Sequence, residues 1–506
     1  MKFINVFLFK PYVMKTKLFT IAAFINFVFI SAQVPIVEWK KKSGDISFNF
    51  AQRIITTLDG DFITTGIKYS NNKSNISVTK LNSNGNILWQ KDLEHIENTG
   101  SYSIQSTSDG EYILAGYISN KKGDSYDENG LIIKLNNSGD IQWQKILGGS
   151  STDEFKSIET TSDGGYIVAG SSNSNDGDVN ENNGSTDVWI VKLNSVGNIL
   201  WQKSLGGIYN DRIGKIINSK DGGYVIAGST ITNRGTFPEE NLNFDAWVVK
   251  LNSLGVVEWG KTFGGSGADV AYSLKQTLDE GFIIAGMNNS SDGDIIGNNG
   301  AQDSWIIKLN NIGELQWQKS LGTEVFEMVT SIDLTKDGGY ILSGKTSNTE
   351  MEISDGASNN GLNAFVIKLN DIGLIQWQKI ISETGYEYPK SIIEDKDGDY
   401  VIAGFNKFNL DYDAWIVKLA TENLTNTIFK TKSFTMYPNP TTSIINFESP
   451  NNSKIGKVVI SELTGKTLIK LTENTKRIDI QNLSKGLYLI EVYFDNEKFI
   501  GKFLKE

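Results

Sequence analysis

The sequence contains no cysteine, which excludes disulfides, thiolate metal sites and cysteine nucleophiles. Histidine occurs once, at His95, and no pattern around it supports a Ser-His-Asp arrangement, so we interpret it as a solvated loop residue. Arginine occurs only at the scattered positions Arg53, Arg212, Arg234 and Arg477, so the arginine cluster with which sialidases hold a substrate carboxylate is not indicated. No catalytic set stands out, and stability must come from packing.

Proline is also scarce, at 7 of 506 residues, while glycine reaches 50 and Asn, Ser, Thr and aromatic residues are frequent. This composition is typical of many short strands joined by tight turns, so we expect an all-β chain. The formal net charge is -11, and no concentrated basic patch is visible. Because phosphate contacts need such a patch, we expect no nucleic-acid partner.

The N-terminus predicts export. Lys15 and Lys17 precede an apolar run over 18–30, and the small residue Ala32 follows it. This order is typical of a signal peptide, here over 1–32, whose apolar core is short for a stable membrane span. A retained anchor is the alternative. After cleavage we expect no membrane span.

A repeated unit fills the middle of the chain. The motif WQK, or a near variant, recurs every 50 to 60 residues, with its tryptophan at Trp39, Trp89, Trp143, Trp201, Trp259, Trp317 and Trp377. The turn in TSDGGYIVAG keeps the same steps, with its aspartate at Asp59, Asp109, Asp163, Asp221, Asp279, Asp337 and Asp397. The two series agree and indicate seven copies of one unit.

Each copy predicts four strands. In the copy over 155–206 they are FKSIETT, GYIVAGS, DVWIVKL and NILWQKSL, which are rich in β-branched and aromatic residues. The short connections SDGG and NSVG join the first pair and the last pair as hairpins. Four strands in each of seven units predict a seven-bladed β-propeller with one four-stranded sheet per blade, and a solenoid is the alternative.

The two ends of the array favour the ring. The last copy, over 391–419, supplies three strands and lacks a WQK strand, whereas PIVEWKKK at 35–42 is a fourth strand without its own unit. We therefore expect the N-terminal strand to close the last blade of a propeller over 33–420, which leaves no open sheet edge between its ends. The LGGSG-type glycines, the DGGYI turn and the D-x-W-I-x-K-L-N-x-x-G motif resemble the bacterial seven-bladed β-propeller repeat family. That resemblance implies architecture and export, and no catalytic set transfers with it.

A different kind of segment ends the chain. Residues 421–433 are polar enough to be a linker, and short alternating strands with turns over 434–506 predict a small β-sandwich. This segment resembles the type A C-terminal sorting domain of the type IX secretion system of Bacteroidetes-like bacteria, because YPNP, VVISELTGK, LSKGLYLIEV and a basic, apolar tail follow in that order. The motif residues are Tyr437, Pro438, Asn439, Pro440, Gly465, Gly486 and Tyr488.

The resemblance to a sorting domain implies two partners, the type IX secretion machinery and its sorting peptidase. It implies passage through the periplasm, removal of the domain, and either release into the medium or attachment at the outer cell surface. An ordinary β-sandwich accessory module is the alternative.

Binding is expected on one face of the disc. In an antiparallel blade the two tight turns lie on one face, the tight-turn face. The loops between the second and third strands lie with the blade connections on the opposite face, the long-loop face. The longest loops span 171–187, 229–245, 287–303 and 345–363.

Irregular loops on a rigid scaffold usually carry binding sites, so we expect an unknown extracellular glycan, protein or surface component there. A polysaccharide hydrolase or lyase that uses Asp and Glu of these loops as acid and base is one alternative. A structural or adhesive surface protein is another.

All eleven tryptophans occupy repeat positions, which favours packing between blades over a sugar-stacking platform. The lysines of WQK and IVKLN also recur in nearly every blade. We expect them to point outward from half-exposed strands rather than to form a binding patch.

One loop offers a metal site. Asp176, Asp178 and Asn180 place oxygen ligands at alternate positions, and Asp187 follows at the offset of the last ligand of an EF-hand loop, so calcium is the cofactor that the sequence suggests. Glu181 stands where an EF-hand needs glycine, and Asp187 also belongs to the repeated D-x-W motif. A solvated turn rich in Asn and Asp is the alternative, and no other cofactor is expected.

Overall fold

The structure is a computed structural model. It describes residues 34–42, 49–70, 73–93, 98–122, 125–231, 243–347, 361–382, 385–408, 411–421, 435–448, 455–462, 467–471, 476–494 and 497–506. Every regular element in these ranges is a β-strand, as the composition predicts. No helix in these ranges is long and apolar enough to cross a membrane. The expected signal peptide, nearly all of the expected linker, His95 and Gly465 lie outside the described residues.

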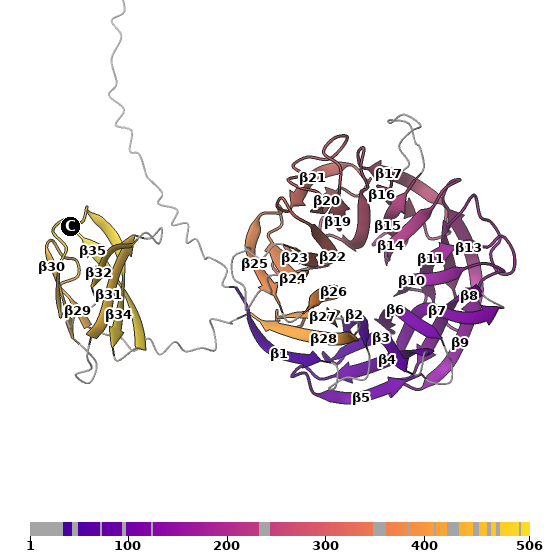
Figure 1. Ribbon diagram of the computed structural model, residues 1–506, viewed down its shortest axis with the longest axis horizontal. Coiled ribbons are helices and arrows are strands. Elements are labelled where there is room, and N and C mark those ends of the chain that lie inside the picture. The colour runs from indigo at the N-terminus through magenta and orange to yellow at the C-terminus, as the bar shows by residue number, and fades with distance from the viewer. Residues whose placement is uncertain are drawn as a thin grey trace, which may run out of the picture.

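Seven four-stranded antiparallel sheets stand around a common centre, and we call them blades 1 to 7 (Figure 1). Blades 1 to 3 consist of β2 (Phe50–Thr56), β3 (Phe62–Ser70), β4 (Lys73–Leu81) and β5 (Ile87–Asp92); β6 (Thr99–Ser106), β7 (Tyr112–Lys122), β8 (Ser125–Leu135) and β9 (Ile141–Leu147); β10 (Asp153–Thr160), β11 (Tyr166–Ser172), β12 (Asp187–Leu193) and β13 (Ile199–Leu205).

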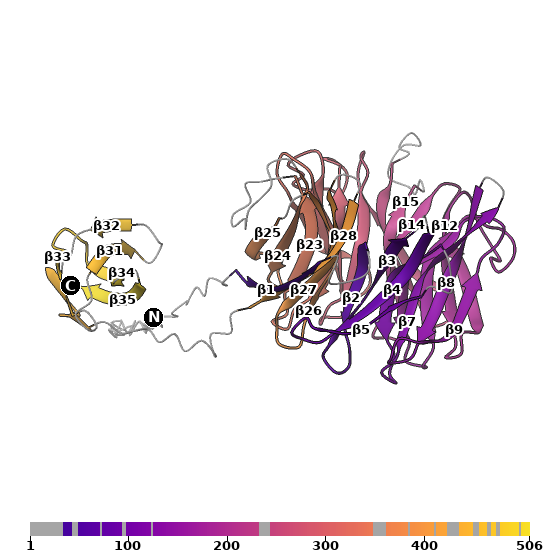
Figure 2. The same ribbon diagram turned by 60° about the horizontal axis from the view of Figure 1, so that its bottom comes forward.

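Blades 4 to 6 consist of β14 (Asp211–Asn218), β15 (Tyr224–Thr230), β16 (Asp245–Leu251) and β17 (Val257–Phe263); β18 (Val270–Gln276), β19 (Phe282–Asn288), β20 (Asp303–Leu309) and β21 (Leu315–Leu321); β22 (Glu327–Leu334), β23 (Tyr340–Thr346), β24 (Asn363–Leu369) and β25 (Ile375–Ile381). Blade 7 consists of β26 (Tyr386–Glu394), β27 (Tyr400–Phe408), β28 (Asp411–Ala420) and β1 (Ile36–Lys42). The first strand of each blade lies nearest the centre, and Figure 2 shows the strands running between the two faces of the disc.

The burial of each strand explains its residue pattern. The second and third strands of a blade are covered by the neighbouring blades on both sides, so β12, for example, is buried along its whole length. A strand buried on both faces has a continuous apolar run, here the four residues VWIV at 188–191. The outer strand β13 is only partly covered, and it carries the polar residues of the WQK motif.

Tryptophan joins each blade to the next. The WQK tryptophan on each outer strand packs against an aromatic ring on the second strand of the following blade, with ring centroids 5.6 to 6.3 Å apart. A glycine in the following blade's last tight turn accommodates the indole: Gly139, at φ 82°, would place a Cβ 2.7 Å from the Trp89 ring. These tryptophans therefore belong to the core, as their repeat positions indicate.

The first and last blades meet through β1. This strand pairs antiparallel with β28 in the register Ile36 to Ala420 through Lys42 to Trp415. Trp39 packs on Phe62 of blade 1 with centroids 6.3 Å apart, the same contact as at the other six blade boundaries. One buried apolar cluster contains residues of blades 7 and 1 together. The seven-bladed architecture with a last blade completed by the N-terminal strand is confirmed.

The repeated lysines of the third strands correct one expectation. Lys192 is 3% exposed rather than outward-facing, and its Nζ lies 2.8 Å from an Asp163 carboxylate oxygen in the first tight turn. Lys250, Lys308 and Lys368 repeat this arrangement. Burial acts in the opposite direction, but hydrogen bonds from Lys192 and Thr161 lower the pKa of Asp163 to about 2. The alternation of residue types cannot reveal that a buried lysine stem reaches a turn carboxylate at the rim.

The C-terminal segment is a β-sandwich. One sheet contains β29 (Thr435–Tyr437), β30 (Ile444–Glu448) and β33 (Arg477–Asp479), and the other contains β32 (Thr467–Leu471), β31 (Ile455–Glu462), β34 (Gly486–Phe494) and β35 (Glu497–Lys505). Buried residues of both sheets, such as Phe447 and Val492, share one apolar core. This part of the fold also agrees with the prediction.

Candidate functional site

The long-loop face carries the irregular connections, but only some of them are described. Residues 232–242 and 348–360, within two of the long loops, lie outside the described residues. The loops that follow β11 and β19 are described throughout. We therefore build the site from these two loops and from the strand ends that surround the central channel.

The proposed calcium ligands take separate partners. An Asp176 carboxylate oxygen accepts the Ser150 backbone N–H at 2.7 Å, and an Asp178 oxygen accepts that of Gly148 at 3.2 Å. Asn180 is exposed, and Asp187 is fully buried. Both aspartates thus cap the glycine turn between two blades, which no motif within the loop itself reveals.

The related loop of blade 5 behaves in the same way, because Asp292 accepts the Ser266 N–H and Asp294 accepts that of Gly264. Among the described residues, no group of three or more His, Asp or Glu side chains is placed to hold a metal ion. Calcium binding at the loop of Asp176 stays a prediction.

Buried carboxylates meet at the blade boundaries. At the turn between blades 4 and 5, a Cβ on Gly264 would lie 2.2 Å from an Asp245 oxygen and 3.0 Å from an Asp269 oxygen, so only glycine fits there. Asp245 Oδ1 is buried without a hydrogen-bond partner among the described residues. Burial, with the nearby charges of Asp269 and Asp294, raises the pKa of Asp245 to about 7.

Asp245→Asn should therefore stabilise the propeller at pH 8. A folded pKa of about 7 against an ordinary 3.8 means that the stability contributed by protonated Asp245 is present at low pH and is lost as pH rises through 7. An amide removes that loss, by on the order of 2 kcal/mol. The melting temperature should rise more at pH 8 than at pH 5. Asn129 and Asn363 already occupy this register position in blades 2 and 6, so the amide fits the repeat.

The matched control is Asp163→Asn in a tight turn. The pKa of Asp163 is held at about 2, so its ionised form is stabilising above pH 4, and the amide should lower the melting temperature at pH 8. A lower melting temperature for Asp245→Asn at pH 8 would contradict the assignment of an uncompensated buried charge.

An aromatic and lysine cluster occupies the long-loop end of blades 6, 7 and 1. Phe50 lies with its ring centroid 4.7 Å from both Phe405 and Tyr412, and Tyr388 stacks on Phe405 at 4.9 Å. Three lysine ammonium groups lie over the rings, at 4.9 to 5.6 Å from the centroids: Lys345 over Tyr388, Lys390 over Phe405 and Lys407 over Tyr412. Aromatic faces attract cations, so the cluster is held together while its edge stays polar.

Part of this cluster faces solvent. Tyr69 beside Phe50 is 54% exposed, and Tyr386 and Phe408 are 43% and 54% exposed. Three lysines gather beside it at the central channel, and one of them, Lys156, pairs with Glu154 at 2.7 Å. Burial lowers the pKa of Lys390 to about 8, and the charges of Lys345 and Lys156 lower it further. We call this set of rings and lysines the aromatic-lysine cluster.

The first and second strands of each blade form a residue pair next to the second-strand glycine, on its long-loop side. The residues of this pair differ from blade to blade. The pairs are Phe50 with Ile67, Gly100 with Tyr117, Glu154 with Ser171, Arg212 with Ser229, Val270 with Met287, Met328 with Lys345 and Tyr388 with Phe405. At the next register position the second strand keeps glycine in every blade, whereas its partner on the first strand varies from Ala51 to Phe155 and Pro389.

Sequence reasoning missed this cluster because it concentrated on tryptophan. The signal is the density of Tyr and Phe in YEY, FNKF and DYD over 386–413, which the other copies lack. The topology then brings Phe50, from the opposite end of the chain, beside them.

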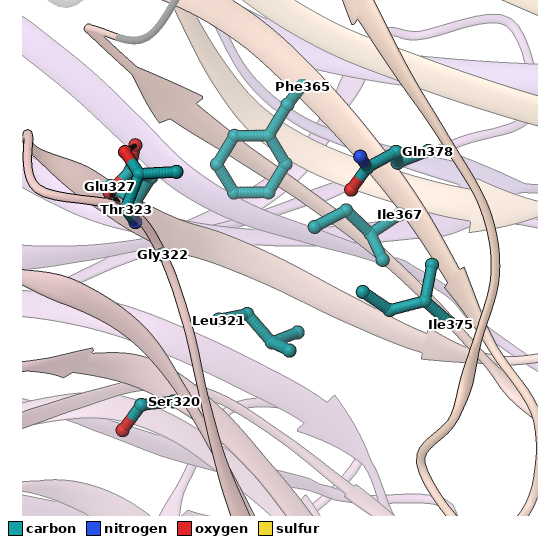
Figure 3. Close-up of a pocket in the computed structure, with 9 residues that line it drawn as sticks. All are labelled: Ser320, Leu321, Gly322, Thr323, Glu327, Phe365, Ile367, Ile375 and Gln378. Atoms are coloured by element: carbon teal, nitrogen blue, oxygen red, sulfur yellow. Dashed lines mark hydrogen bonds between the residues drawn. The ribbon is translucent and has the colours of Figure 1, made fainter. Parts of the chain in front are cut away.

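A pocket of about 280 Å³ lies between blades 5 and 6 (Figure 3). In blades 3 and 5 the third-strand tryptophans Trp189 and Trp305 donate their indole N–H to a glutamine of the outer strand at 2.9 Å. Blade 6 has Phe365 at this position, opposite the equivalent Gln378. Figure 3 shows the Phe365 ring between the side that carries Glu327 and the side that carries Gln378. The pocket is therefore the space that an indole fills elsewhere.

Phe365→Trp should fill this pocket and raise the stability of the propeller. The added ring buries apolar area, and its N–H gains the Gln378 acceptor, so we expect a gain of about 1 kcal/mol. Thermal melting measures it, and Trp305→Phe, the reverse change in blade 5, should lower the melting temperature. A destabilising Phe365→Trp would contradict this interpretation of the pocket.

The described sorting-motif residues lie in the C-terminal sandwich. The exposed YPNP turn, Tyr437 to Pro440, is tied to the last strand because the Asn439 side chain accepts the Leu504 backbone N–H at 2.9 Å. Gly486 begins β34, and Tyr488 is buried, stacks on Phe503 at 5.5 Å and donates its hydroxyl to the Ser484 carbonyl. The motif thus builds a compact C-terminal end.

Residues 435–506 match the family described as "Secretion system C-terminal sorting domain". A curated relative, the regulatory protein FlaEY of Caulobacter vibrioides, is 23% identical over 385 residues, covering 66% of this chain and 39% of that protein. The chain thus spans well under two thirds of that relative.

Among solved structures, the WD40 domain of Neurospora crassa Pan2 has a TM-score of 0.46 at 9% identity and covers 76% of this chain and 96% of its own. PorZ, a surface component of the type IX secretion system of Porphyromonas gingivalis, has a TM-score of 0.39 at 11% identity and covers 90% and 59%. The polysaccharide lyase Uly1 has a TM-score of 0.43 at 10% identity and covers 73% and 90%. At these values the likenesses carry nothing about ligand or activity.

Proposed function

We propose that this chain, a β-propeller whose type IX sorting domain implies secretion or export to the outer surface, is a binding protein without catalytic activity and that it holds an acidic glycan on the long-loop face. The aromatic-lysine cluster is the observation that supports this proposal. Exposed rings offer flat apolar faces for sugar rings, and the lysines around them pair with carboxylate or sulfate groups.

The rest of the propeller is consistent with a rigid scaffold that holds the aromatic-lysine cluster in place. Four aspartates of the long loops that follow β11 and β19 accept backbone N–H groups of glycine turns, so these four hold the loops in place: Asp176, Asp178, Asp292 and Asp294. A scaffold held by seven equivalent tryptophan contacts keeps the cluster in place without needing to close around a ligand.

Binding to polygalacturonate tests this function. The purified protein should be retained on immobilised polygalacturonate and eluted by salt, because the lysine contacts are screened. Tyr386→Ala should weaken binding roughly three- to tenfold, as expected for loss of one exposed ring. Lys345→Ala with Lys407→Ala should lower the salt concentration needed for elution.

The matched control is Lys261→Ala on the exposed outer strand β17, which should leave retention unchanged. Equal retention on neutral dextran, or unchanged elution of the double lysine variant, would contradict the proposal. Release of sugar from polygalacturonate during the assay would contradict the non-catalytic part.

A further inference from the structure

A ring of serines ties neighbouring blades together at the channel wall. The inner strands of blades 2, 3, 5, 6 and 7 carry serine at one register position, and each hydroxyl bonds to the backbone of the next blade at 3.2 to 3.4 Å. The serines are Ser103, Ser157, Ser273, Ser331 and Ser391. Ser391 reaches Ile54 of blade 1 across the junction of the chain ends.

Two blades depart from this ring, and both departures are cations. Arg53 in blade 1 and Lys215 in blade 4 stand at the serine position. At these two positions the repeat loses the serine hydroxyl that bonds to the next blade. Departures from a repeated structural pattern are expected at functional sites.

Both cations line a cavity of about 420 Å³ at the tight-turn end of the channel, opposite the aromatic-lysine cluster. Lys275 of blade 5 joins them. Lys215 pairs with Glu159 at 2.8 Å, and Lys275 pairs with Asp333 at 2.6 Å. A third carboxylate, Glu394, also lines the cavity and accepts the Lys336 backbone N–H at 2.8 Å.

Arg53 differs from the two lysines, because it forms no ion pair with a described carboxylate of this lining. Its Nε is buried and has no hydrogen-bond partner among the described residues. A buried guanidinium donor without an acceptor is costly, because its desolvation is not repaid. The charges of these groups affect one another. Burial lowers the pKa of Lys215 to about 8; the nearby Glu159 raises this pKa, and the charges of Arg53 and Lys275 lower it further.

We propose that this cavity binds a small hydroxy carboxylic acid of the uronic acid class, with the Arg53 guanidinium holding the carboxylate. The planar fork of arginine matches a carboxylate. Gln105 and Gln276 also line the cavity and offer amide donors and acceptors for hydroxyl groups, while the paired carboxylates Glu159 and Asp333 keep acceptor positions open. The volume lies within the range of sites that enclose one small molecule.

Isothermal titration of the purified protein with D-glucuronate, D-glucose and sulfate tests the site. Glucuronate should bind, glucose should not, and sulfate should bind more weakly than glucuronate. Arg53→Ser, which restores the residue that five blades use, should weaken glucuronate at least about tenfold with an unchanged or raised melting temperature. Arg53→Gln, which keeps the length without the charge, should lose binding equally.

Arg212→Ser is the matched control, because Arg212 lies over the Phe244 ring 4.4 Å away and is not part of the cavity. It should bind glucuronate as the parent does, and so should Tyr386→Ala, which separates this site from the long-loop face. No glucuronate binding by the parent, binding at the parent's level by either Arg53 variant, equal binding of glucose, or tighter binding of sulfate would each overturn the proposal.

Discussion

A protein that lacks residues 34–42 should melt at least roughly 10 °C below the parent and aggregate on heating, because this deletion removes the outer strand of blade 7. Trp39 leaves its contact with Phe62, and Val34 and Val37 leave the cluster between blades 6 and 7. The deletion also exposes the edge of β28, which presents unpaired backbone groups to other chains. Thermal melting with light scattering measures both effects.

A circular permutant supplies the control for this deletion. In blade 7, Leu419 pairs with Val37 in the same register as Leu251 with Val257 in blade 4. Residues 252–256 can therefore be copied as the turn from Leu419 to Val37, in a chain that begins at Asn49. This permutant should melt close to the parent. If the deletion variant instead melted like the parent, β1 would not be an integral part of the ring.

The repeat made the fold predictable because each blade boundary uses the same contacts. Spacing alone located the seven tryptophans, and the missing fourth strand of the last copy identified β1 as its replacement. The sandwich followed from short alternating strands and the order of the sorting motifs.

The candidate sites were less predictable because they depend on residues from different blades. The spacing of Asp176 and Asp178 predicts a calcium loop. In the structure their carboxylate oxygens instead accept N–H groups of a glycine turn that lies 26 to 30 residues earlier in the chain. Phe50 and Phe405 are brought together only when the ring forms. Arg53 is recognised as a departure from the repeat only when its register position is compared with that of the five serines.

The central claim is that an exported propeller is delivered by its C-terminal sandwich, and deletion of residues 435–506 tests it most directly. Fractionation of the producing bacterium should find the parent protein in the medium or at the outer surface. The deletion variant should lose nearly all of that fraction and accumulate, folded and protease-resistant, inside the cell envelope, because the matched sorting domain is its export signal. A signal-peptide-bearing reporter that ends in residues 435–506 should gain the extracellular fraction that the variant loses. Normal surface or extracellular amounts of the deletion variant would contradict the account.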